Sequence, residues 1–94
     1  MNFSPNNKIT IPDTTLFQEL DGECVLLNLA NESYYGLNQT GTRMWAVLAK
    51  SNSITNALSV LSEEYDIDEK TLSSDLYQFI DELLENQMVE IVVA

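Results

Sequence analysis

The 94-residue sequence contains no histidine, a single cysteine and only four basic residues. Without histidine, the chain lacks the side chain that most often serves as a general base near neutral pH. Cys24 cannot form an internal disulfide or a cysteine metal cluster, and it lies in an apolar stretch, where a thiol is usually inert. The serine and threonine residues have no activating partner that the sequence reveals. We therefore expect no enzyme active site, no bound metal and no cofactor.

The scarcity of basic residues also limits the ligands that this chain can bind. Fifteen acidic residues outnumber the four basic ones, which gives a formal net charge of −11. Proteins that bind DNA or RNA use several Lys or Arg to neutralise phosphates, and proteins on anionic membranes need similar basic patches. We expect neither nucleic acid nor membrane as a partner, whereas a basic or neutral peptide or protein fits the charge.

Long apolar runs are absent as well. No segment is long enough to span a bilayer, and the N-terminal MNFSPNNKIT lacks the apolar run of a signal peptide, so a cytoplasmic location is expected. The length and the 45% hydrophobic content predict a single domain over residues 1–94 with one modest core. We expect residues 1–13 to be flexible or extended: residues 1–8 are polar and predicted to fray, and Pro12 favours extended backbone before it.

The first half of the remaining chain predicts three strands in a meander. Residues 14–20 are rich in β-forming side chains, and Asp21-Gly22 is a typical hairpin turn before the nearly continuous apolar run of residues 23–29. A turn at residues 30–33 leads into a third strand at 34–37. The apolar run suits a strand that is covered on both faces, or one whose outer face meets a partner.

The second half predicts three helices. Asn38 or Thr40 can cap the first helix, whose apolar residues recur at helical spacing and include Trp45, which we interpret as core. Ser53 can cap a second helix, and Asp68 a third with one broad apolar stripe. Residues 88–93 read as a final strand or β-wing. The predicted fold is α+β: a three-stranded antiparallel sheet, then three helices as a winged helix-turn-helix, with a possible C-terminal β-wing.

A winged helix-turn-helix usually suggests DNA, but the third helix carries the acidic residues Asp75, Asp81, Glu82 and Glu85 and has only Lys70 near its start. These charges would repel phosphates. A groove between the edge of the 34–37 strand and the third helix could instead take an extended peptide. For Leu72, Leu76 and Phe79 the alternative is that all three are simply core.

Three segments of the sequence then resemble a known family: GECVLLNLANESYYGLNQTGTRMWAVL, ITNALSVLSEEYDID and LSSDLYQFIDELLENQMV. In order and spacing they are similar to the PqqD-like peptide-modification chaperones, also called RiPP recognition elements. The resemblance covers roughly residues 16–89. Gly36-Leu37-Asn38 looks more like the members of lasso-peptide pathways than those of the quinone cofactor.

The resemblance implies that the leader of a ribosomally made precursor peptide adds as an antiparallel strand to the third strand, in the cleft with the third helix. The residues carried over onto this chain are Asn31, Glu32, Ser33, Tyr34, Tyr35, Leu72, Asp75, Leu76 and Phe79. Asp75 could pair with a basic or hydroxyl group of the leader, or be an ordinary surface acid. The chain departs from the family in its acidity and in Gln87, where a glycine often ends the third helix.

The sequence thus predicts a non-catalytic peptide chaperone that binds a precursor leader and presents it to a modifying enzyme or leader protease. The alternative is a winged-helix interaction or regulatory module without a leader peptide, in which the third-strand edge would be covered. A DNA-binding regulator is a third, weaker hypothesis. An empty edge could also pair two copies of the chain into a homodimer.

Overall fold

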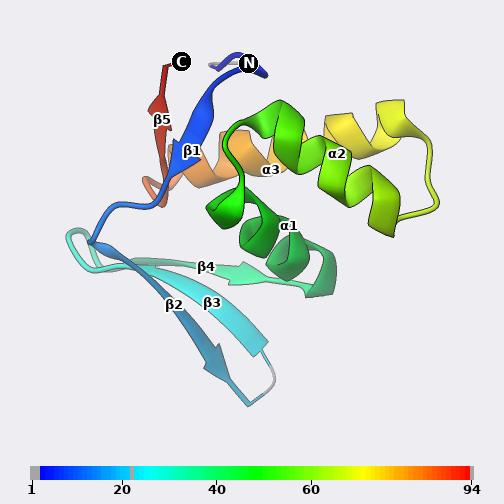
Figure 1. Cartoon of the computed structure of the whole chain (residues 1–94). Helices are drawn as coiled ribbons and strands as arrows, with labels where there is room; N and C mark the ends of the chain where they lie inside the picture. The colour runs from blue at the N-terminus through cyan, green and yellow to red at the C-terminus, as the bar shows by residue number, and fades with distance from the viewer. Residues whose placement is uncertain (1–2, 22, 94) are drawn as a thin grey trace.

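The computed structural model describes residues 3–21 and 23–93. A three-stranded sheet lies on one side of a three-helix layer, and a two-stranded sheet pairs a strand near the start of the chain with one near its end (Figure 1). The α+β prediction, with a meander followed by three helices, is confirmed.

The larger sheet has the strand order β2-β3-β4, with both pairs antiparallel. Its strands are β2 (Thr15–Leu20), β3 (Glu23–Asn28) and β4 (Ser33–Leu37), close to the predicted ranges. Asp21 adopts a left-handed conformation (φ 52°), as the first residue of a tight hairpin requires. Gly22, the second residue of the predicted turn, lies outside the described residues.

The helices are α1 (Gln39–Lys50), α2 (Ile54–Glu64) and α3 (Glu69–Glu85). The Asn38 side chain accepts a hydrogen bond from the Gly41 backbone N–H (2.7 Å), which identifies Asn38, and not Thr40, as the cap of α1. Ser53 caps α2 in the same way, whereas Asp68 stands at the N-cap of α3 without a side-chain cap bond. None of these helices, over the ranges that the structure describes, is long and apolar enough to cross a membrane.

The core fills the space between the helices and the inner face of the sheet. Trp45 is only 7% exposed, so its interpretation as core is confirmed. On the inner face of the sheet, the Leu26 side chain is fully buried and belongs to the core that the helices share. The fully buried large side chains that share this core are Leu26, Ile54, Leu61, Leu72, Leu76, Ile80, Leu83 and Met88.

The chain ends form a second sheet that the sequence did not predict. β1 (Lys8–Thr10) pairs antiparallel with β5 (Glu90–Val92), so the predicted C-terminal strand exists but finds its partner at the N-terminus. In the described part of residues 1–8, Phe3 and Asn7 are buried, and Lys8 begins β1. The Phe3 ring packs edge-on against Tyr77 (5.8 Å between centroids), and this aromatic contact holds the segment down.

Helix α3 is followed by a residue in the left-handed conformation. Gln87 has φ 58°. The Gln87 N–H bonds to the Leu84 carbonyl (3.1 Å) and the Met88 N–H to the Leu83 carbonyl (2.9 Å), the two bonds of a Schellman motif. Met88 and Leu83 are both fully buried, which supplies the apolar contact of that motif. Glutamine therefore ends this helix as a glycine would, at some conformational cost.

Candidate functional site

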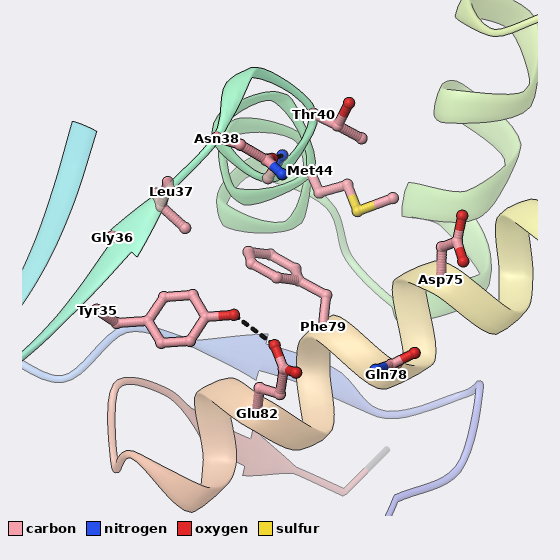
Figure 2. A pocket seen from close by; sticks show the side chains of 11 residues that line it. Tyr35, Gly36, Leu37, Asn38, Thr40, Met44, Asp75, Gln78, Phe79 and Glu82 are labelled. Carbon is pink, nitrogen blue, oxygen red and sulfur yellow. Dashed lines mark hydrogen bonds between the residues drawn. The ribbon is translucent and has the colours of Figure 1, made fainter. Parts of the chain in front are cut away.

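A groove separates β4 from α3, and the N-terminal end of α1 closes it at one side (Figure 2). Its hollow encloses about 270 Å³. The lining residues come from these three elements and the turn between β4 and α1: Tyr35, Gly36, Leu37, Asn38, Thr40, Gly41, Met44, Asp75, Gln78, Phe79 and Glu82. The groove thus lies where the sequence predicted it.

The outer edge of β4 is open in the part of the chain that the structure describes, because β4 is the last strand of its sheet. Successive residues of an antiparallel strand direct their backbone groups alternately to one side and the other. The bond from the Leu29 N–H to the Thr14 carbonyl (2.7 Å) fixes this alternation, so that odd-numbered residues of β3 face β2. By the register of β3 with β4, Tyr34 and Gly36 then direct N–H and C=O to the open edge.

Tyr35 and Glu82 join the two walls of the groove. The Tyr35 hydroxyl donates a hydrogen bond to the Glu82 carboxylate (Figure 2), and the Tyr35 ring centroid lies 6.4 Å from that of Phe79. Burial, together with the hydrogen bond and the negative charge of Glu82, raises the pKa of Tyr35 to about 12 from its ordinary value of 10.0. The hydroxyl therefore stays protonated, and keeps donating, at alkaline pH where an ordinary tyrosine begins to ionise.

The hollow combines an apolar base with a polar rim. Leu37, Met44 and Phe79 are buried, whereas Asp75 and Gln78 are exposed on α3 above them. Gly41 leaves room for the cap of α1, because a Cβ there would lie 3.2 Å from the Asn38 Oδ1 that accepts from the Gly41 N–H. Such a site suits a side chain with an apolar body and a polar end.

The structure brings three of the residues predicted for the site to the groove: Tyr35 lines it from β4, while Asp75 and Phe79 line it from α3. Tyr34, also on β4, directs its backbone to the open edge but does not line the hollow. Leu72 and Leu76 do not reach it, because their side chains are 1% and 0% exposed in the core, the alternative that the sequence left open.

Asn31, Glu32 and Ser33 lie at the other end of β4 and do not line the hollow. Asn31 is engaged locally: its Oδ1 accepts from the Ser33 N–H (3.0 Å), and its Nδ2 donates to the Gln87 Oε1 (3.1 Å).

The lining residues that sequence reasoning missed include Gly36, Gln78 and Glu82. The last two stand three and seven residues after Asp75, so helical periodicity applied to Asp75 would have found them. Gly36 could have been found by strand alternation from Tyr34, since both direct their backbone to the same edge.

Comparison with known proteins agrees with this architecture. The family model described as coenzyme PQQ synthesis protein D (PqqD) matches residues 23–89. The chain belongs to the PqqD family. The family prediction is thus confirmed for the sheet from β3 onward and for all three helices. Among curated protein sequences, none matches this PqqD-family chain.

Two solved structures are similar to the PqqD-family chain over most of its length. "TbiB1 in Complex with the TbiA(beta) Leader Peptide" is 30% identical with a TM-score of 0.77, and the match covers 86% of this chain and 94% of that one. "Lasso peptide synthetase B1 complexed with the leader peptide" has a TM-score of 0.78 at 22% identity, over 88% of this chain and 98% of that one. The second likeness bears on the fold alone.

Proposed function

We propose that this chain is a non-catalytic peptide chaperone. It binds the leader of a ribosomally synthesised precursor by strand addition to β4 and presents the precursor to a modifying enzyme or leader protease, in a pathway of the lasso-peptide type. The observation that carries the proposal is the open edge of β4 facing α3 across the groove. We propose that the protein binds the leader in the cytoplasm, where a ribosomal precursor is made, and that binding requires no cofactor.

The β4 edge supplies affinity that does not depend on the leader's sequence. The outward N–H and C=O groups of Tyr34 and Gly36 match the spacing of an added antiparallel strand. Gly36 presents no side chain, and a Cβ built there would meet nothing within 4 Å, so the approach to the edge is unobstructed. The backbone from Asn31 to Tyr35 continues this edge toward the preceding turn.

The α3 wall supplies selectivity. The hollow of about 270 Å³ has room for one side chain of moderate size, with Phe79 below it and Asp75 at its rim. A basic or hydroxyl group on that side chain can bond to Asp75, and the net charge of −11 favours a neutral or basic leader. Leu72 and Leu76 contribute from beneath, by holding α3 in place.

The alternative function, an interaction module without a leader, is less well supported. It requires the β4 edge to be covered, and no other described segment pairs with that edge.

The sharpest test compares Gly36→Pro with Gly36→Ala. Proline at this edge position removes the outward N–H without touching the β3 ladder, whereas alanine keeps the N–H and has free space for its Cβ. We expect the alanine variant to bind a fluorescently labelled leader, encoded beside this gene, as the native chain does. The proline variant should bind at least about tenfold more weakly, because it loses a backbone bond worth about 1 kcal/mol and crowds the edge.

Equal leader binding by the two variants, both folded by circular dichroism, would contradict strand addition at β4. Failure of the native protein to bind any neighbouring leader would favour the interaction module. If the empty edge instead pairs two copies of the chain, light scattering will give a mass that rises with concentration in the alanine variant and not in the proline variant.

A further inference from the structure

The β2-β3-β4 sheet has a second face that no described part of the chain covers. All three helices lie on one side of this sheet (Figure 1). Strand alternation places Leu16, Leu27 and Tyr34 on the opposite side, and the register puts them in one row across the three strands. Leu16 is 40% exposed and Tyr34 is 72% exposed.

The row continues beyond the strand ends. Leu29, directly after β3, extends the ladder through its N–H bond to the Thr14 carbonyl, and its side chain is 60% exposed. Val25 lies half-buried in the neighbouring row of the same face. We call Leu16, Val25, Leu27, Leu29 and Tyr34 the outer apolar face. A contiguous exposed apolar group of this kind marks an interaction surface, whereas isolated exposed apolar residues do not.

Acidic residues border this face at both ends. Asp21 and Glu23 stand at the β2–β3 turn, and Asp13 and Glu32 at the opposite end of the strands, all four exposed. No Lys or Arg occurs between Lys8 and Arg43. The border is therefore of one sign, with no cation of its own strands to neutralise it.

We infer that the outer apolar face is a docking surface for a folded protein whose own apolar patch is bordered by Lys and Arg. Rows of side chains on a sheet face present an even surface, which suits a folded partner better than a single peptide strand. The acidic border disfavours a second copy of this chain and an anionic membrane, because both would bring like charges together.

This surface goes beyond leader binding, and it rests on the proposed function in that the partner is the enzyme to which the leader is presented. A strand added to β4 lies in the plane of the sheet, so it leaves the outer apolar face accessible. Leu16, on the far strand β2, is separated from the leader edge by β3. One chain can thus hold leader and enzyme at the same time.

The test is a double variant, Leu16→Thr with Leu29→Ser, and a matched control, Val60→Thr with Ile67→Ser. The control removes apolar groups of similar exposure from α2 and the turn after it. The probes are the purified modifying enzymes and peptidases encoded beside this gene, titrated by biolayer interferometry against the immobilised chain, with the labelled leader measured in parallel.

We expect one of these enzymes to bind the native chain and the control equally, and the double variant about tenfold or more weakly, with leader affinity the same in all three. Binding should weaken as salt rises from about 0.05 M to about 0.5 M, because the charged border is screened.

Equal enzyme binding by the double variant and the control would overturn the inference, as would the absence of enzyme binding to a native chain that binds leader. If the affinity for the enzyme does not change with salt, the partner's patch is not bordered by Lys and Arg. If the native chain has the mass of a dimer and the double variant that of a monomer, the partner on the outer apolar face is a second copy of the chain and not the enzyme. Loss of leader binding in the native chain would contradict the proposed function itself.

Discussion

Tyr35 on β4 donates its hydroxyl to the carboxylate of Glu82 on α3, so a single hydrogen bond joins the two walls of the groove. This bond predicts a stability change confined to alkaline pH. The pKa of Tyr35 is raised in the fold, to about 12 from 10.0, so its contribution to stability is fully present below pH 10 and is lost as pH rises through about 12. Ultraviolet titration of tyrosinate should show one tyrosine that ionises late.

Tyr35→Phe should remove that late titration and lower stability at neutral pH by about 1 kcal/mol, the usual worth of one hydrogen bond. Tyr34→Phe is the control, because Tyr34 is 72% exposed and no hydrogen bond of its hydroxyl occurs among the described residues. A late titration that survives in Tyr35→Phe would show that another tyrosine is responsible.

Replacing the buried polar residue Asn28 should lower the stability of the fold strongly. It is buried at 4% exposure; its Nδ2 donates to the Gln87 carbonyl (2.9 Å), and its Oδ1 accepts from the Ala30 N–H (2.9 Å). Asn28→Ala removes the partner of the Gln87 carbonyl and of the Ala30 N–H in a part-buried region, so we expect a loss of about 2 kcal/mol. Urea unfolding followed by Trp45 fluorescence measures it. Asn31→Ala, at an exposed position, should cost clearly less; equal losses would refute the assignment.

Gln87 predicts a gain in stability from a single substitution. Its φ of 58° is easy for glycine and strained for other residues. Gln87→Gly should raise the free energy of unfolding by up to about 1 kcal/mol, whereas the β-branched Gln87→Val should lower it by about 1–2 kcal/mol. The urea midpoint compares them, and a glycine variant no more stable than the valine variant would be inconsistent with the left-handed geometry.

Adjacent residues of α3 should separate folding from binding. Leu76 is fully buried, so Leu76→Ala should cost about 2–5 kcal/mol of stability and leave the leader affinity of the folded fraction nearly unchanged. Asp75→Asn should leave the urea midpoint unchanged and weaken binding of a basic leader, most clearly at low salt. Anisotropy titrations at two salt concentrations give the second result; unaltered affinity in Asp75→Asn would assign Asp75 to the ordinary surface.

Much of the fold could be predicted because local signals agreed with it. The alternation of strands, the helical recurrence of apolar residues and the caps at Asn38 and Ser53 are all short-range features. The groove between β4 and α3 was predicted from these elements, and the family resemblance added a precursor leader as the peptide that it would bind.

The features of the fold and the site that the sequence did not predict depend on long-range contacts, which no local pattern encodes. The β1–β5 pair joins residues about eighty positions apart, so its pairing has no local signal, although the C-terminal strand itself was predicted. The broad stripe of α3 contains both core and groove residues, and only its packing showed that Leu72 and Leu76 are core while Phe79 also lines the hollow. The Tyr35–Glu82 bond is likewise invisible without the fold.

The end of α3 is fastened to the sheet by more than one contact. Asn28 and Asn31 both donate to Gln87, and the Thr15 hydroxyl donates to the Met88 carbonyl (2.8 Å). The walls of the groove therefore keep their separation before any peptide arrives. The conformational entropy lost on binding then falls almost wholly on the peptide, so a leader held extended by chemical cross-linking would gain affinity where a further stiffening of the protein would not.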